Sequence, residues 1–252
     1  YNALNWKLPI YAHIPLIHGM DGGKLSKRHG ALGVDSYDDM GYLQEAMLNY
    51  LLRLGWSYGD KEIISRDEAI ELFNLEAIGK SSAKFDIERL TSLNAHYIDN
   101  KNDEELTVLV KNFYQIKKNM DITNNDLSLI KNGMNGIKSR ARTINELAEM
   151  CSFYIEKAPI TLDKKSKKIL NDDNISLLKL YYKELSKLTI WNQKEIEENI
   201  KKYCENNNIN LGKLAQPLRA ATTGKSVSPG LYELMEVLGK KETLARIINI
   251  NN

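Results

Sequence analysis

Apolar residues recur at helical spacing along almost the whole chain after residue 40, and this pattern constrains the fold more than any other feature. One clear example runs from Leu43 to Leu54 and is followed by Gly55, a residue type that commonly ends helices. Alternating strand patterns are almost lacking in the same region. The sequence therefore predicts a mainly α protein, with a short irregular or β segment over residues 1–38, where proline and glycine are frequent.

Several helix starts can be placed from their capping residues. Ser65 with Glu68, and Thr143 with Glu146, have the spacing of a capping box, in which two side chains satisfy backbone N–H groups at the helix start. Asn192 begins a similar pattern further along the chain. Asp86 is expected to cap a further helix, because its carboxylate can accept from the N–H groups that follow.

The end of the chain has its own start and stop signals. Ser228 followed by Pro229 predicts a capped helix with proline at its first position, where the missing N–H costs nothing. Gly239 is expected to end that helix. Residues 119–136 are polar and rich in Gly and Asn, and they predict a loop or a short helix.

The charges are unevenly distributed although the net charge is only +2. Residues 60–105 contain 12 acidic and 6 basic side chains, whereas residues 111–168 contain 12 basic and 6 acidic ones. One end of the chain could therefore attract phosphate without the whole protein being basic. The alternative is an unevenly charged, solvated surface.

Other features exclude several classes of protein. No apolar run reaches the roughly 18 residues needed to span a membrane. Two cysteines and four histidines lack the spacing of a disulfide framework or a metal site, so we predict no metal and a reducing, cytoplasmic compartment. The chain does not begin with Met, so we expect a piece of a longer protein.

The most informative short segment is Gly22-Gly23-Lys24-Leu25-Ser26-Lys27-Arg28. Two glycines permit close approach of the backbone to a ligand, and the three cations that follow can surround a polyphosphate. Taken alone, the segment is more typical of a solvated loop.

Seen in its context, Lys24–Arg28 resembles the second signature of class I aminoacyl-tRNA synthetases, in the form found in bacterial glutamyl-tRNA synthetases. Further segments resemble that family in the same order: His13–Ile17, His29–Ala31, Leu48–Ser57, Phe85–Asp86, Leu93–Asn94, Tyr97–Ile98, Leu218–Ala220, Thr223–Gly224, Ser228–Leu231 and Leu238–Lys240. The ordered set is more specific than any one motif.

The resemblance implies an ATP loop and an anticodon site. Lys24 and Lys27 would stabilise the transition state in which glutamate attacks the α-phosphate of ATP, assisted by Mg²⁺ in the full-length enzyme. Leu25, Ser26 and Arg28 would complete the ATP contacts, with Arg28 in place of the final serine of the wider class.

Six residues fall where the family contacts the tRNA anticodon. Single-stranded bases can stack on guanidinium planes and form hydrogen bonds along their edges, so arginines suit this role. Of the two arginines in the third-base region, the resemblance favours Arg142 over Arg140. Ser228 and Pro229 could instead form a plain helix cap, and Leu231 could be a core residue. The expected anticodon contacts are Arg140, Arg142, Arg219, Ser228, Pro229 and Leu231.

The resemblance also divides the chain into three parts. Residues 1–38 would be the end of the catalytic domain, residues 39–129 a helical stem-contact domain, and residues 130–252 an all-α anticodon-binding domain shaped as a helical cage. The family's His-Ile-Gly-His signature does not occur in these 252 residues. The chain alone is therefore expected to be unable to form glutamyl-adenylate.

The implied partners are tRNA(Glu), with ATP and L-glutamate in the full-length enzyme, and a monomer is expected. Charging of tRNA(Gln) stays open. The main alternative is a stand-alone, non-catalytic RNA-binding module. A glutaminyl-tRNA synthetase is disfavoured because its anticodon region is built of β-barrels, and the glutamylating enzyme that modifies queuosine in tRNA is disfavoured because it lacks this C-terminal half.

Overall fold

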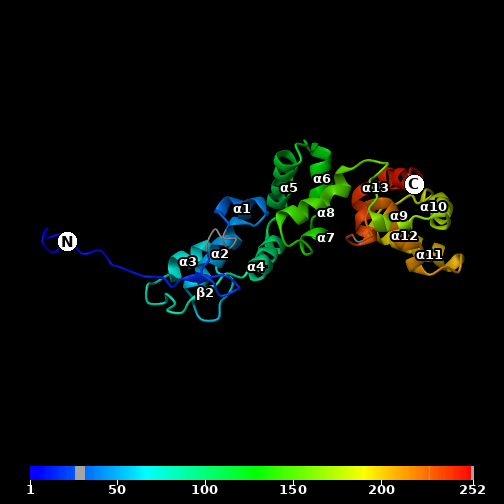
Figure 1. The fold of residues 1–252 in the computed structure, drawn as a ribbon. Helices are drawn as coiled ribbons and strands as arrows, with labels where there is room; N and C mark the ends of the chain where they lie inside the picture. Colours follow the sequence, from blue (N-terminus) through cyan, green and yellow to red (C-terminus); the bar gives the residue numbers. More distant parts are fainter. Residues whose placement is uncertain (26–31, 227, 251–252) are drawn as a thin grey trace. The chain divides into compact units, whose positions relative to one another are not determined.

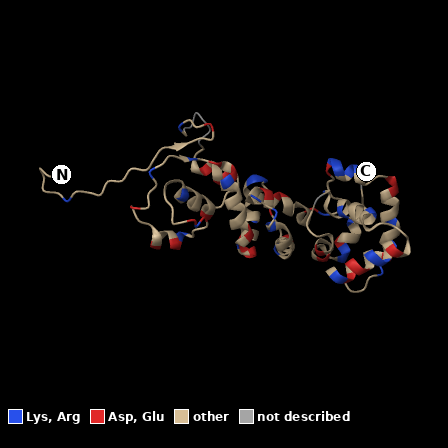
Figure 2. Ribbon diagram, turned by 90° about the horizontal axis from the view of Figure 1, so that it is seen from below, with Lys and Arg blue, Asp and Glu red and all other residues tan. Residues whose placement is uncertain are grey.

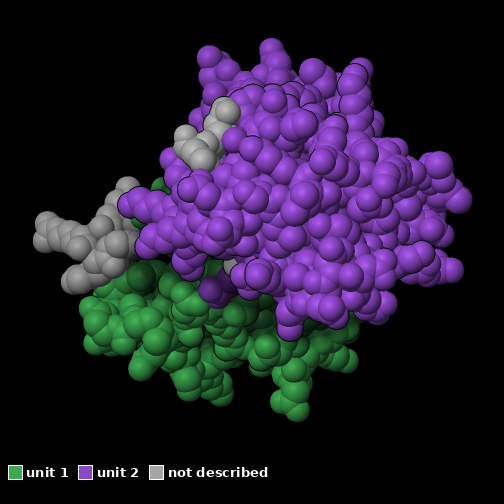
Figure 3. All heavy atoms as spheres, turned by 90° about the vertical axis from the view of Figure 1, so that its right-hand side faces the viewer, with its two compact units in different colours: residues 1–98 green, residues 99–252 purple. Residues whose placement is uncertain are grey.

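The computed structural model describes residues 1–25, 32–226 and 228–250. Within these ranges the chain forms thirteen helices and two short strands, which confirms the mainly α prediction (Figure 1). It divides into two compact units, residues Tyr1–Ile98 and Asp99–Asn252 (Figure 3). The helices of residues 99–129 thus group with the segment that follows them. The three-part division given above concerns function and stays a prediction.

The first unit contains four helices and a small parallel sheet within its described residues. Strands β1 (Ile17–His18) and β2 (Ala83–Lys84) pair with Ile17 opposite Ala83. Two-residue strands give no periodic signal, so β2 was not predicted. The helices are α1 (Val34–Asp39), α2 (Gln44–Gly55), α3 (Arg66–Leu72) and α4 (Ile87–Asn100), the last of which continues into the second unit.

Tyrosines dominate the core of the first unit. Tyr37, Tyr42 and Tyr50 are buried, and the ring of Tyr50 meets the edge of Phe85 at 5.2 Å between ring centroids. The hydroxyl of Tyr50 donates to the backbone oxygen of Asp86 and accepts from its N–H. This contact fixes the start of α4 against α2.

Two of the predicted helix starts in this unit are confirmed. Ser65 Oγ accepts from the N–H of Glu68, and Glu68 Oε2 accepts from the N–H of Ser65, each at 3.2 Å. Asp86 Oδ1 accepts from the N–H of Glu88 at 2.9 Å and so caps α4. Such caps stabilise a helix by about 1 kcal/mol each.

Helices are the only regular secondary structure among the described residues of the second unit. Apolar faces of these helices pack on one another, and Leu147, Leu178 and Leu218 are fully buried among them. Nine helices follow α4: α5 (Asp103–Lys117), α6 (Asn124–Gly133), α7 (Asn135–Lys138), α8 (Ile144–Ile155), α9 (Lys164–Ile169), α10 (Asp172–Leu185), α11 (Gln193–Asn206), α12 (Leu211–Thr223) and α13 (Leu231–Ile248).

Capping signals in the sequence located two helix starts of this unit. Thr143 Oγ1 accepts from the N–H of Glu146, which confirms Thr143 as the N-cap of α8. Glu146 Oε2 in turn accepts from the N–H of Arg142, one residue before the cap. Asn192 caps α11 as predicted. The polar segment of residues 119–136 contains α6 and the start of α7, so it is helical over much of its length.

The predicted start of the last helix is wrong. Helix α13 begins at Leu231 with Gly230 as its N-cap, and no side chain caps it. Ser228 does not act as the cap because its hydroxyl is engaged by Arg219, nine residues earlier. The expected stop at Gly239 is present as a break: Gly239 has φ 77°, after which the chain becomes helical again.

Candidate nucleic-acid interface

The connection between α12 and α13 is held by one arginine side chain. Arg219 lies on α12, and its Nη1 donates to the backbone oxygen of Ser228 at 3.1 Å and to that of Pro229 at 2.5 Å. The same nitrogen also contacts Ser228 Oγ. A single guanidinium therefore fixes residues 228–230, which we call the Ser228 turn.

A second arginine reaches this turn from another part of the chain. Arg140, just after α7, donates from Nη1 to the same backbone oxygen of Ser228 at 3.1 Å. Arg140 is exposed and Arg219 is half-buried. Burial, and then the nearby charge of Arg140, lower the pKa of Arg219. The two guanidinium groups thus raise the local positive potential.

Neither Arg140 nor Arg219 forms an ion pair with a carboxylate in the part of the chain that the structure describes. Acidic and basic residues are interspersed along many helices (red and blue in Figure 2). The positive charge of this site therefore comes from the local pairing of Arg140 with Arg219. Two positive charges that share a neutral acceptor favour a negatively charged or electron-rich ligand.

The other predicted anticodon contacts are placed differently. Arg142 is exposed beside Thr143, the N-cap of α8. Pro229 is buried, and Leu231 is 4% exposed and belongs to the core. The structure therefore brings Arg140, Arg219 and Ser228 together, while Leu231 supports the turn from inside.

Sequence reasoning did not identify Tyr232 as part of this region. Its side chain is half-buried, and burial raises its pKa, so the phenol stays neutral. It also lies close enough to Arg219 for the two to influence each other's pKa. Tyr232 directly follows Leu231 in the family-like segment, which is the signal that could have indicated it.

A buried arginine fixes the end of α12, from which the chain leads toward the Ser228 turn. Arg246 is 1% exposed and donates to the backbone oxygens of Thr222 and Glu156, each at 2.6 Å. Its Nε donates to Glu242 Oε1 at 2.8 Å. These bonds satisfy a charge that would be costly to bury alone, so the end of α12 is rigidly placed.

The glycine-rich segment of the first unit forms a hydrogen-bonded hairpin. The N–H of Gly19 donates to Gly23 O at 2.8 Å, and the N–H of Leu25 donates to Ile17 O at 2.9 Å. Gly22 sits at the bend with φ 81°, a conformation that favours glycine. Lys24 is exposed on this hairpin and Leu25 is partly exposed. Ser26, Lys27 and Arg28 lie outside the described residues, so their ATP contacts stay predictions.

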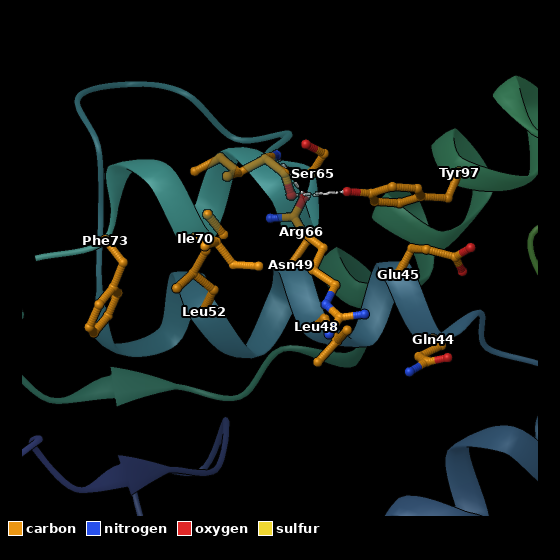
Figure 4. Close-up of a pocket in the computed structure, with 12 residues that line it drawn as sticks. Gln44, Glu45, Leu48, Asn49, Leu52, Ser65, Arg66, Ile70, Phe73 and Tyr97 are labelled. Atoms are coloured by element: carbon orange, nitrogen blue, oxygen red, sulfur yellow. Dashed lines mark hydrogen bonds between the residues drawn. The ribbon is translucent and has the colours of Figure 1, made fainter.

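The first unit also has an open hollow of about 630 Å³ between α2 and α3 (Figure 4). Leu48, Leu52 and Ile70 line it. Two of its polar side chains bond to each other, since Tyr97 donates to Asn49 Oδ1 at 2.8 Å. No predicted site residue lines this hollow.

In residues 1–25, 32–226 and 228–250, no group of three or more His, Cys, Asp or Glu side chains could hold a metal ion. None of the helices found there is long and apolar enough to cross a bilayer.

Two family models match the chain one after the other and place it among the class I aminoacyl-tRNA synthetases. Residues 1–92 match the catalytic domain family of class I tRNA synthetases (E and Q), and residues 104–250 match the anticodon binding domain family. Within this class, the chain belongs to the glutamate–tRNA ligase family.

Individual relatives agree with this assignment. The chain is 47% identical over 248 residues to glutamate–tRNA ligase 2 of Paramagnetospirillum magneticum, covering 98% of this chain and 52% of that protein. It is 48% identical over 246 residues to glutamate–tRNA ligase 2 of Zymomonas mobilis, covering 97% of this chain and 51% of that one.

A solved structure extends the similarity to the fold. The glutamate tRNA ligase of Elizabethkingia meningosepticum, crystallised with its amino acid, has a TM-score of 0.82 and 30% identity, covering 98% of this chain and 52% of that chain. The chain thus spans about half the length of the relatives it matches.

Proposed function

We propose that this chain supplies the anticodon-binding part and the ATP loop of a glutamate–tRNA ligase. The whole enzyme would convert ATP, L-glutamate and tRNA(Glu) to glutamyl-tRNA, AMP and diphosphate. The observation that carries the proposal is the convergence of Arg140 and Arg219 on Ser228 O, without an acidic partner in the described residues. The functional division is 1–38 for the catalytic remnant, 39–129 for stem contact and 130–252 for the anticodon.

The arginine pair suits an unstacked RNA base. A guanidinium offers a flat face for stacking and several N–H donors for base edges or phosphate oxygens. Arg219 is already held by three acceptors on the Ser228 turn, so it loses little further freedom when RNA binds. Arg140, Arg142 and Arg219 would make the base contacts, with Ser228 offering its hydroxyl and Pro229 and Leu231 shaping the turn.

The arginines also bear on which tRNA is preferred. An arginine near the third anticodon base accompanies strict charging in the family that this chain resembles. We therefore propose tRNA(Glu) as the substrate, with tRNA(Gln) bound more weakly. A guanidinium that contacts a base edge contributes about 1–3 kcal/mol of discrimination against the wrong base.

The hairpin would serve the first chemical step of the whole enzyme. When glutamate attacks the α-phosphate of ATP, negative charge builds on the phosphoryl oxygens, and Lys24 and Lys27 would stabilise it. Leu25, Ser26 and Arg28 would contact the nucleotide around them. Bound Mg²⁺ would neutralise phosphate charge in that enzyme, which we expect to act as a monomer in the cytoplasm.

A stand-alone RNA-binding module is the second candidate. Arg140, Arg219 and the Ser228 turn, which we call the arginine site, all lie within this chain. ATP–pyrophosphate exchange separates the two. We expect no glutamate-dependent exchange from these 252 residues with or without tRNA, and exchange from a longer protein that includes the preceding half. If the longer protein also fails to exchange, the module is the better description.

Titration of this chain with tRNA transcripts tests the anticodon part. We expect tRNA(Glu) to bind more tightly than an unrelated tRNA at the same salt concentration, since phosphate contacts alone are not selective. Equal affinity for both transcripts would remove the proposal.

A further inference from the structure

Helix α9 is a short basic surface beside α12 (Figure 1). It contains Lys164, Lys165, Lys167 and Lys168, and all four side chains are exposed. In the described ranges, none of the four ammonium groups forms a hydrogen bond or an ion pair with another residue. The four charges are thus available to an external partner.

Other lysines of the same unit behave differently. Four of them form ion pairs with glutamates at 2.5–2.8 Å: Lys118 with Glu149, Lys131 with Glu104, Lys187 with Glu184, and Lys201 with Glu197. The acidic residues nearest in sequence to α9 are Asp163, Asp172 and Asp173. Asp172 and Asp173 lie in the first turn of α10, where negative charge stabilises the helix end.

The carboxylate of Asp163 accepts hydrogen bonds from backbone N–H groups. It caps α9, with Oδ1 accepting from the N–H of Ser166 at 2.6 Å. Hydrogen bonds from the N–H groups of Ser166 first and of Ser226 further on hold its pKa below the usual value. Its carboxylate therefore stays ionised and is engaged by backbone N–H groups.

Asp163 also joins α9 to the connection between α12 and α13, which contains the Ser228 turn. The N–H of Asp163 donates to Gly224 O at 2.8 Å, and Ser226 lies only two residues before Ser228. Gly224 has φ 71°, and a Cβ there would lie 2.0 Å from Thr161 O, so only glycine permits this approach. The basic helix is thus fixed next to the Ser228 turn within one unit.

We propose that the four lysines of α9 bind the sugar-phosphate backbone of the tRNA anticodon arm, beside the bases that the arginine site contacts. This inference rests on the proposed function. A helix of six residues is about 9 Å long. It can face more than one of the phosphates of a strand, which follow at about 3.4 Å along a duplex axis. Lysines act there as mobile point charges, so they would strengthen binding without selecting a sequence.

The test compares two quadruple variants of the full chain. K164Q/K165Q/K167Q/K168Q removes the α9 charges, and the control K118Q/K131Q/K187Q/K201Q removes the same number from lysines that are paired with glutamates. Each protein is titrated with a tRNA(Glu) transcript and with a transcript altered at the third anticodon base, between about 50 and 200 mM salt. Circular dichroism verifies that each variant is folded.

We expect the α9 variant to bind both transcripts more weakly by the same factor. The slope of log affinity against log salt should become shallower by about 0.7 for each lost phosphate contact, so by about 2–3 in all. The ratio of the two affinities should stay as in the unaltered chain, and the control should keep the original slope.

Three results would overturn the inference. These are an unchanged salt slope in the α9 variant, an equal change of slope in the control, and a change in the α9 variant of the affinity ratio alone. If the unaltered chain still binds tRNA(Glu) selectively, any of these results leaves the proposed function intact. A chain that binds no tRNA removes both. If the quadruple variant unfolds, K164Q/K165Q and K167Q/K168Q are each expected to show about half of the effect.

Discussion

Arg140 and Arg219 donate to the same acceptor, the backbone oxygen of Ser228, each at 3.1 Å. One arginine follows α7 and the other lies on α12, so the Ser228 turn is positioned by two distant segments of the second unit. Two like charges on one carbonyl repel each other. A negatively charged or electron-rich RNA group would relieve that repulsion.

Loss of Arg219 should impair tRNA binding and selectivity together. R219A removes both the proposed base contact and the three bonds that hold the Ser228 turn. We expect the affinity for tRNA(Glu) to fall about 10- to 100-fold, and the affinity for a transcript altered at the third anticodon base to fall less. Filter binding measures both values.

Two comparisons control this measurement. R140A should have a smaller effect, because Arg219 still fixes the turn, and K241A should change little, since it removes one exposed charge elsewhere on α13. An equal loss for both transcripts in R219A would reduce Arg219 to a phosphate contact.

Replacement of Arg246 should destabilise the second unit. R246M removes the donor to the backbone oxygens of Thr222 and Glu156, and it removes the cation that pairs with Glu242. Breaking such a buried pair typically costs about 3–5 kcal/mol of the free energy of unfolding. Urea denaturation followed by circular dichroism measures it. A loss below about 1 kcal/mol, the size expected for an exposed site such as R66M, would contradict the assigned role.

Gly133 should tolerate no side chain. A Cβ at this position of α6 would lie 2.1 Å from the hydroxyl oxygen of Tyr154 on α8, and the ring carbons are almost as near. Because Tyr154 is buried, G133A should lower the free energy of unfolding by about 1–3 kcal/mol. G212A is the matched control, since its Cβ would meet only Asn210 Oδ1 at 3.4 Å. Equal thermal midpoints for the two variants would show that α6 and α8 do not pack this closely.

Cys151 should be unreactive until the protein unfolds. The side chain is fully buried, and burial raises the pKa of its thiol to about 12. At pH 8 the folded protein therefore holds the neutral thiol, whereas the reactive form is the thiolate. In a C204A background, a thiol reagent should label Cys151 at the rate of unfolding, and rapidly in urea. Rapid labelling of the folded chain would show that this core is open.

The same pKa shift has a consequence for stability at alkaline pH. The unfolded chain ionises Cys151 near pH 8.5, and the folded chain only near pH 12. The stabilisation from the protonated thiol is therefore complete below about pH 8.5 and is lost progressively as the pH rises toward 12. Comparison with C151A across this range isolates the contribution of Cys151.

Local signals in the sequence located four of the thirteen helix starts in the described residues. Ser65 with Glu68, Asp86, Thr143 and Asn192 mark helix starts that the structure confirms, because each cap involves residues within one turn of helix. Such contacts depend on spacing alone, so a single sequence suffices to predict them.

Contacts between distant segments were not predictable in this way. Ser228 looked like a helix cap, but Arg219 engages its hydroxyl and moves the helix start to Leu231. Strand β2 contains only two residues and pairs with β1 far earlier in the chain. The attachment of α9 to Gly224 likewise depends on tertiary packing, so the position of its lysines relative to Arg219 and Ser228 could not be predicted from the sequence.

Nucleotide-resolution footprinting of tRNA(Glu) by this chain tests the central claim most directly. We expect the protein to protect the anticodon loop, and we expect R219A to lose protection there while the folded helical content stays unchanged. Protection confined to the acceptor stem, or a loop pattern that is the same for R219A and the unaltered chain, would contradict the assignment of the Ser228 turn to the anticodon.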